Sequence, residues 1–154
     1  ILIHKLIIVI DFKTILLNCS INSVLAKILL GNLIGCFITA VMAILAIPEL
    51  VIKCQNIVET HLTINGWAVL ILGIGCGFIM TTAVEFARKK QYLPLLFGVP
   101  LFILCGFQHS VADAFYYLAS FTFDWNLLGL WLLIVLGNYL GCNAYKLFIN
   151  YKNN

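Results

Sequence analysis

The sequence predicts an all-α integral membrane protein. Of its 154 residues, 63% are apolar or aromatic and only 10% are charged, and the mean hydropathy is +1.07. Soluble domains are roughly half apolar and one quarter charged. The apolar residues gather in long uncharged stretches, the pattern of membrane-spanning helices. This composition excludes a water-soluble enzyme and a disordered chain, and the lack of a basic run excludes a nucleic-acid-binding domain.

Three segments are each long enough for one membrane crossing. Ile28–Ile47, Trp67–Val84 and Asn126–Tyr145 contain eighteen to twenty residues without a charge. Because a helix rises about 1.5 Å per residue, each can cover a hydrocarbon core of about 30 Å. We predict one spanning helix in each segment.

A fourth apolar segment, Leu93–Phe123, is too long for one straight crossing and contains a single charge, at Asp113. Near its middle lie Pro100, Gly106 and the polar cluster Gln108-His109-Ser110. Proline and glycine interrupt helices. We therefore predict one crossing that is broken in the middle.

The N-terminal segment Ile1–Ile10 is apolar but only half a span long, and a polar stretch, Asp11–Ser20, follows it. It has no basic region followed by a cleavage site, so we do not expect a signal peptide. We interpret it as the second half of a helix whose first half precedes the chain. The polar stretch then follows a half-helix, as the polar cluster does in Leu93–Phe123.

A short internal repeat supports two similar halves. The sequence GNLIGC at 31–36 recurs as GNYLGC at 137–142. Close helix packing explains glycines at this spacing, namely Gly31, Gly35, Gly137 and Gly141, but not the shared Asn and Cys. Many transporters and channels consist of two such halves, with their site at mid-membrane where the broken helices meet. We expect one channel domain, with residues 1–47 ending the first repeat, 48–65 connecting and 66–154 forming the second.

The placement of charges predicts the orientation. Alternate crossings put one group of basic residues on one side, namely Lys27, Arg88, Lys89, Lys90, Lys146 and Lys152. Lys53 falls on the other side together with Glu49, Glu59 and Asp124. By the positive-inside rule, the loop at 88–90 and the C-terminus are cytoplasmic and the two repeats are inverted. We expect a multi-pass protein of the cell (inner or plasma) membrane, with the connector along the outer interface.

The candidate functional residues lie at the predicted break. A histidine at mid-membrane usually faces a cavity, a partner or a permeation path, and it exchanges protons near neutral pH; the alternative for His109 is a buried ring satisfied by a backbone carbonyl. Ser110 and Asp113 have the spacing of a capping box, with Ser110 as N-cap, and the positive end of the half-helix would favour an anion. His109 and Asp113 are too few ligands for a metal, and we expect no cofactor.

These residues also carry a family resemblance. Cys105–Tyr117 (CGFQHSVADAFYY) resembles the GFEHSxAN-x-F signature of the formate/nitrite transporter family. The segment LGNYLGC is similar to that family's last helix, and Val9–Asn18 resembles its AELFTGN loop. The resemblance covers essentially the whole chain, from partway through the second of six transmembrane helices.

The resemblance implies an aquaporin-like inverted-repeat bundle with two broken helices, assembled as a homopentamer with one pore per protomer. It implies transport of small monovalent anions such as formate, nitrite or hydrosulfide, or of their neutral acids. By position, His109 corresponds to the pore histidine and Thr14 to its hydroxyl partner from the opposite half. Phe102 and Leu2 fall at apolar constrictions, and Phe12 lies in the loop beside Thr14.

The chain departs from the family pattern at four positions. Gln108 stands for the motif's Glu and Asp113 for its Asn, and Lys13 and Ile15 alter the loop. Two alternatives to a channel stay open. One is a non-conducting paralogue or truncated remnant, in which Lys13 and Ile15 close the loop. The other is a membrane enzyme using His109 and Asp113, although no nucleophile is placed for it.

Overall fold

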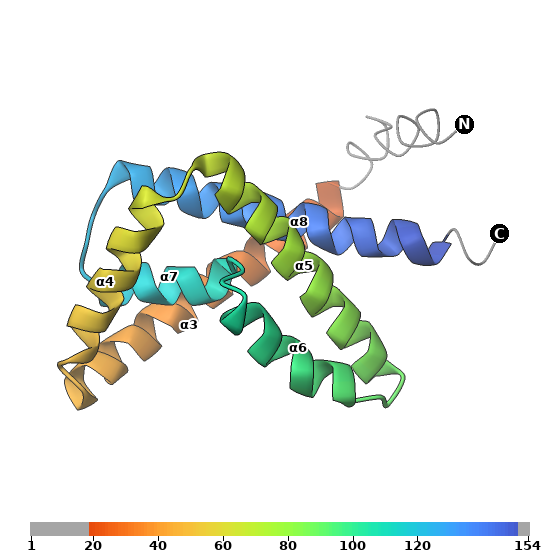
Figure 1. The fold of residues 1–154 in the computed structure, drawn as a ribbon, viewed down its shortest axis with the longest axis horizontal. Coiled ribbons are helices and arrows are strands. Elements are labelled where there is room, and N and C mark those ends of the chain that lie inside the picture. Colours follow the sequence, from red (N-terminus) through yellow and green to blue (C-terminus); the bar gives the residue numbers. More distant parts are fainter. Residues whose placement is uncertain (1–18, 151–154) are drawn as a thin grey trace. The chain divides into compact units, whose positions relative to one another are not determined.

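The structure is a computed structural model that describes residues 19–150 of the chain. These residues form six α-helices, labelled α3 to α8 (Figure 1). The bounds are Cys19–Ala46 for α3, Leu50–Thr63 for α4, Gly66–Arg88 for α5, Leu93–Leu104 for α6, Ser110–Ala119 for α7 and Trp125–Asn150 for α8. Contacts divide the chain into two compact units, Ile1–Gly35 and Cys36–Asn154. All packing described below lies within the second unit.

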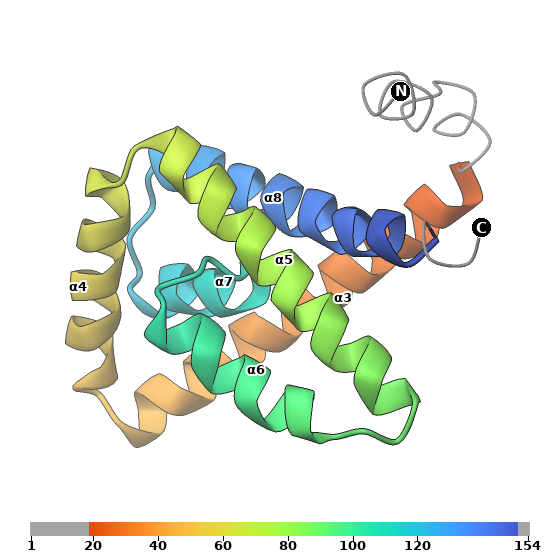
Figure 2. The same cartoon turned by 45° about the vertical axis from the view of Figure 1, so that its right-hand side comes forward.

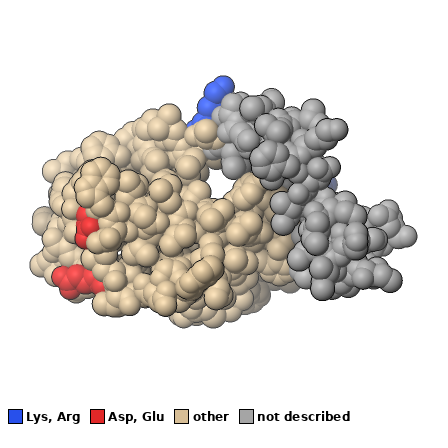
Figure 3. Space-filling model, turned by 90° about the horizontal axis from the view of Figure 1, so that it is seen from above, with Lys and Arg blue, Asp and Glu red and all other residues tan. Residues whose placement is uncertain are grey.

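Three of the helices are long and apolar enough to cross a membrane, over Ala26–Ala46, Gly66–Arg88 and Trp125–Tyr145. They contain the predicted segments Trp67–Val84 and Asn126–Tyr145 completely and Ile28–Ile47 except for its last residue, so the predicted all-α membrane class and these three helices are confirmed. Large apolar side chains face outward, for example Phe37 and Met42, as lipid favours and water does not. On the face drawn in Figure 3, most of the described surface is uncharged.

Local interactions explain why α5 begins and ends where it does. Asn65 is its N-cap, and the Asn65 side chain accepts a hydrogen bond from the Trp67 N–H at 3.0 Å, which satisfies one of the free N–H groups of the first turn. Arg88 forms an ion pair with Glu85 at 2.6 Å in the last turn. The chain then reverses at Lys90, whose φ is 62°.

Helices α5 and α8 pack backbone to backbone through glycines. A Cβ added at Gly73 would lie 3.2 Å from the Gly137 Cα, and one added at Gly141 would collide with the Ile74 carbonyl oxygen. Small residues four apart permit this close approach. Contacts advance together along both helices, from Gly66 with Leu133 to Phe78 with Tyr145. Helices α5 and α8 therefore run parallel.

Helix α6 runs back along α5 in the opposite direction (Figure 2). Gly98 of α6 lies against Ala83 and Ile79 of α5, whereas the Phe107 ring, after the end of α6, lies against Gly75. The glycine at 75 leaves the space that this ring occupies, because an added Cβ would collide with it. The segment after α6 therefore lies beside the middle of α5.

Helices α4 and α7 pack against each other and against the end of α3. Their shared core consists of Ala40 of α3, Cys54 of α4 and Ala119 of α7, all nearly inaccessible. Phe115 and Tyr116 pack around these small residues. This core holds α7 beside the segment that precedes it.

Candidate functional site

The segment 105–109 between α6 and α7 is the centre of the candidate site. Gly106 has a φ of 68°, a conformation that glycine adopts without strain, and the Phe107 N–H donates to the Phe102 carbonyl at 2.9 Å. The segment faces the middle of α5 at Gly75 and the middle of α8 at Asn138. It therefore lies at half the length of two helices that are long enough to span a membrane.

Asn138 of α8 fixes this segment with all of its side-chain hydrogen-bonding groups. Its Oδ1 accepts from the Ser110 N–H at 2.9 Å, and its Nδ2 donates to the carbonyls of Gln108 at 2.9 Å and Gly73 at 3.0 Å. The indole N–H of Trp131 donates to the Ser110 carbonyl at 2.8 Å. The Ser110 N–H and the Gln108 carbonyl, which no helix pairs, thus find a partner on α8, as apolar surroundings require. The repeat motif drew attention to this asparagine, but its role depends on contacts between distant segments.

His109 is the N-cap of α7. Its Nδ1 accepts from the N–H groups of Val111 at 3.2 Å and Ala112 at 3.4 Å, and its carbonyl accepts from the Asp113 N–H at 2.9 Å. This differs from the predicted capping box, in which Ser110 was the cap. The helix begins at Ser110 itself, whose N–H is bonded to Asn138. The imidazole therefore reaches the free N–H groups in place of the hydroxyl.

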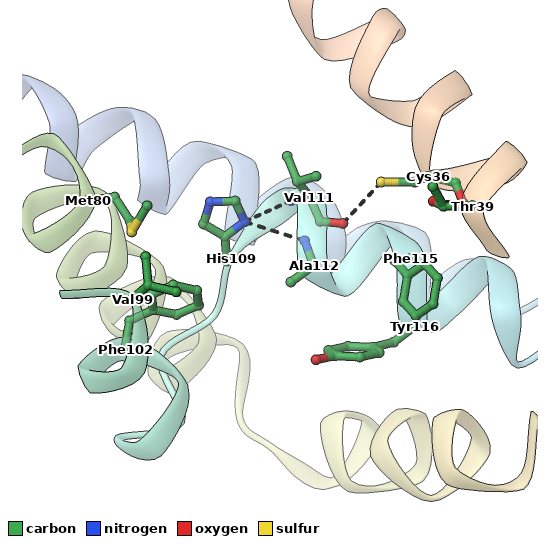
Figure 4. A pocket seen from close by; sticks show the side chains of 10 residues that line it. All are labelled: Cys36, Thr39, Met80, Val99, Phe102, His109, Val111, Ala112, Phe115 and Tyr116. Carbon is green, nitrogen blue, oxygen red and sulfur yellow. Dashed lines mark hydrogen bonds between the residues drawn. The ribbon is translucent and has the colours of Figure 1, made fainter. Parts of the chain in front are cut away.

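The cap fixes which nitrogen of His109 carries the proton. A nitrogen that accepts hydrogen bonds has no proton, so in the neutral ring the proton is on Nε2. The ring stacks on Phe102, with centroids 5.5 Å apart and an interplanar angle of 27°. Its second nitrogen points toward the side of Met80 (Figure 4). His109 therefore presents an N–H group on the side away from α7.

His109 lines an open pocket of about 470 Å³. Its lining comes from four helices and the intervening segment: Cys36, Thr39, Met80, Val99, Phe102, His109, Val111, Ala112, Phe115 and Tyr116 (Figure 4). The Cys36 thiol donates to the Val111 carbonyl at 3.3 Å and the Thr39 hydroxyl to the Cys36 carbonyl at 3.1 Å. The lining is thus mostly apolar, with the imidazole N–H and the start of α7 as its polar features. Such a site suits a small solute that accepts hydrogen bonds.

A family model for formate/nitrite transporter matches residues 19–151. This range covers most of the chain, including the whole pocket. The chain belongs to the formate/nitrite transporter family. Its members are membrane transporters and channels, in agreement with the apolar helices described above. No curated protein and no solved structure matches the chain significantly.

Several residues that the resemblance assigned to the pore lie outside the described residues: Leu2, Phe12 and Thr14, with the altered loop positions Lys13 and Ile15. Of the predicted helix-packing glycines, Gly137 and Gly141 lie at the contact between α5 and α8. Gly31 and Gly35 belong to the first unit, and their packing role stays a prediction. The glycines of α5 at this contact, Gly73 and Gly77, were not predicted, although they have the same four-residue spacing.

In this family member, two buried polar residues flank the cap. Gln108 and Asp113 are each 4% exposed. Within the described part of the chain, Gln108 Oε1 and Asp113 Oδ2 have no hydrogen-bond partner. The Asp113 Oδ1 lies 3.8 Å from the His61 Nδ1 of α4. His61 was not predicted as a site residue, because only the packing of α4 against α7 brings it there.

Among the described residues, no three His, Cys, Asp or Glu side chains form a group that could hold a metal ion. The buried cysteines Cys36, Cys54 and Cys76 are free thiols. Cys36 and Cys54 pack against their neighbours in the pocket and the core, respectively.

Proposed function

We propose that the protein carries small monovalent anions, or the corresponding weak acids, across the cell membrane past His109. The family supports transport in general. The observation that carries the proposal is the His109 ring, whose Nδ1 caps α7 and whose Nε2 side faces a mostly apolar pocket. Formate, nitrite and hydrosulfide are the substrates that we expect.

The direction of the helices supports a path through the middle of the membrane. Because α5 and α8 run parallel, the chain between them must return across the membrane once. Helix α6 has 12 residues and α7 has 10, lengths of about 18 and 15 Å. Each covers about half of the hydrocarbon core, so we infer that together they form one crossing interrupted at 105–109.

The parallel direction of α5 and α8 also supports the orientation in the membrane and the inverted repeats that we propose. Parallel packing puts the C-terminal end of α5, with Arg88 to Lys90, on the same side as the C-terminal end of α8. Basic residues gather on the cytoplasmic side, so we place this side and the C-terminus in the cytoplasm. With residues 1–47 and 66–154 as inverted repeats, the second broken helix would lie at the N-terminal end of the chain. We expect a homopentamer with one pore per protomer, surrounded by lipid.

Electrostatics suggests how the solute crosses. Moving a bare anion into a dry site has an idealised cost on the order of 20 kcal/mol. We expect the Phe102 ring, which stacks on His109, to form the apolar constriction that the family resemblance implies. The positive end of α7 and the Nε2–H group offset part of this cost. The rest of this free-energy cost does not arise if the solute crosses as the neutral acid or together with a proton.

The cap favours hydrogen bonding over proton donation by His109. Protonating Nδ1 would point an N–H group at the N–H groups of Val111 and Ala112. Losing the Nε2 proton instead would leave an anionic ring, which a dry pocket disfavours. We infer that His109 donates a hydrogen bond to the solute, while the accompanying proton comes from another group or from water.

Solute uptake into proteoliposomes tests this function. Formate, nitrite and hydrosulfide are compared for the wild type, His109→Ala and a control variant, Asn143→Ala, whose half-buried side chain bonds within α8 to the Tyr139 carbonyl. We expect uptake of at least one solute by the wild type and the control, and a strong loss in His109→Ala. Absence of uptake by folded wild-type protein would instead support a non-conducting paralogue.

The external pH gives a second test of the permeant form. If the solute crosses as a neutral acid or with a proton, uptake becomes faster as the external pH falls. The initial rate is measured between mildly acidic and neutral pH at a fixed total concentration. A rate that stays constant over this range would contradict the proposed form.

A further inference from the structure

A second buried polar cluster lies behind the pocket, between α4 and α7. The His61 Nδ1 is 3.2 Å from the Tyr117 hydroxyl oxygen and 3.8 Å from the Asp113 Oδ1. The His61 and Tyr117 rings meet edge to face, with centroids 5.9 Å apart. None of the three side chains lines the pocket. The cluster is therefore distinct from His109, although Asp113 lies only one helical turn after it.

The cluster is well shielded and has few charges around it. The His61 and Asp113 side chains are 13% and 5% exposed, and the Asp113 Oδ2 has no hydrogen-bond partner among the described residues. Cys76 of α5 and Tyr116 of α7 lie within electrostatic range of Asp113, and both are ordinarily neutral at neutral pH. Helix α8 carries no charged residue from 125 to 145. His61 is therefore the basic partner that the described residues offer to Asp113.

This pair can hold one proton with no net charge. Either His61 is protonated beside the Asp113 carboxylate, or both side chains are neutral. Removing that proton leaves a negative charge in a buried site, which is costly without compensation. The charge would lie in the first turn of α7, where it opposes the positive end of the helix. A solute anion beside His109 would then be repelled.

We propose that His61 and Asp113 form a proton-binding site that sets the charge beside the permeation path. With the proton bound, the start of α7 attracts the solute anion; with the proton lost, Asp113 repels it and transport slows. This inference rests on the proposed function. The pH dependence of uptake that the protein itself causes then comes from His61 and Asp113. It does not come from His109, whose Nδ1 accepts the hydrogen bonds of the cap.

The position of His61 indicates which solution supplies the proton. His61 lies in the last turn of α4, just before α5 begins. In the proposed orientation, the start of α5 faces the outside. The site therefore responds to the external pH.

The test compares uptake by Asp113→Asn and by the wild type across external pH 5 to 8. Both proteins experience the same fraction of neutral acid, so the ratio of their rates isolates the protein group. We expect the rate of Asp113→Asn divided by that of the wild type to be near one at the acidic end. This ratio should rise with pH by roughly tenfold, as a unit charge near the path implies. The control is Glu59→Gln, the same carboxyl-to-amide change at an exposed position of α4, whose ratio should not change with pH.

His61→Gln provides a second variant and infrared spectroscopy a second measurement. Without the imidazole, Asp113 alone must hold the proton, so the decline of uptake should move to lower pH. Difference spectra between the two ends of the pH range should show a buried carboxylic acid or imidazolium band that Asp113→Asn abolishes. These spectra need no transport, so they test the site even if a variant conducts poorly.

The outcomes separate this inference from the proposed function. Uptake that depends on His109, combined with an Asp113→Asn ratio independent of pH and unchanged infrared spectra, would overturn the proton-binding site alone. Absence of uptake in the wild type would overturn the proposed function. A pH-dependent ratio in the Glu59→Gln control would also contradict the assignment to Asp113.

Discussion

At the start of α7, His109 uses its two ring nitrogens differently. Nδ1 accepts from two backbone N–H groups, while Nε2 is on the other side of a ring that stacks on Phe102. The first contact stabilises the helix and the second nitrogen is the one available to a solute. Substitutions can therefore separate stability from transport at this residue.

Asparagine at position 109 should keep the cap and lose the imidazole. Asn is among the best N-cap residues, whereas alanine cannot cap and costs about 1 kcal/mol of stability. We expect His109→Asn to unfold near the wild-type temperature and His109→Ala below it, with uptake strongly reduced in both. Thermal unfolding in detergent and proteoliposome uptake measure the two effects. Equal destabilisation in both variants would argue against the capping role.

Asn138→Ala should be among the most damaging single substitutions in the described chain. It leaves the Ser110 N–H and the Gln108 carbonyl without their partner, and each buried unpaired group costs about 1–3 kcal/mol. It also removes the bond to the Gly73 carbonyl. We expect a large fall in unfolding temperature together with loss of uptake. Asn143→Ala, which removes an exposed bond to the Tyr139 carbonyl, should change stability by no more than about 0.5 kcal/mol. Similar values for the two variants would contradict this account.

At the scale of the helices, the pairing of α5 with α8 determines where the site lies. The sequence predicted both helices from uncharged length alone, and it predicted the interruption of Leu93–Phe123 from its proline, glycine and polar residues. It did not predict that Gly73 faces Gly137 or that Gly77 faces Asn138, since spacing within one helix does not identify its partner.

Glycine-to-alanine substitutions on α8 should have opposite effects at two positions. A Cβ at Gly141 would collide with the Ile74 carbonyl of α5, whereas one at Gly129 would meet nothing within 4 Å. We expect Gly141→Ala to destabilise by about 1–3 kcal/mol through overpacking. Gly129→Ala should stabilise by up to about 1 kcal/mol through helix propensity. Thermal unfolding of both variants checks this, and a neutral Gly141→Ala would contradict the close packing.

At the scale of the whole molecule, the topology follows from the parallel packing of α5 and α8, which requires one return crossing between them. Charge placement in the sequence already suggested that residues 88–90 and the C-terminus share one side. The helix contacts support the same arrangement from independent observations. The pore residues of the first repeat lie outside the described residues, so Leu2, Phe12 and Thr14 stay predictions from the resemblance.

The partners of His109 show where prediction from sequence ends. The motif identified the histidine, and the composition identified its surroundings as membrane. The cap by Nδ1, the bonds from Asn138 and the approach of His61 to Asp113 all depend on backbone geometry or on contacts between residues distant in sequence. A pattern within one segment does not specify such contacts.

Cysteine labelling in intact cells tests the topology. Lys89 follows α5, and Phe123, which is fully exposed, precedes α8. In a background without native cysteines, we expect an impermeant thiol reagent to label Phe123→Cys from outside and Lys89→Cys only after the membrane is opened. Labelling of both from the same side would contradict a single return crossing between α5 and α8.

The most direct test of the central claim, that solutes cross beside His109, blocks the pocket itself. Ala112 lines this pocket and Leu132 faces outward from α8. Each is changed to cysteine in the background without native cysteines, and uptake is measured before and after treatment with a small charged thiol reagent. We predict that uptake by Ala112→Cys is blocked, that formate slows this block, and that Leu132→Cys is unaffected. Full uptake after complete labelling of Ala112→Cys would show that the solute takes another path.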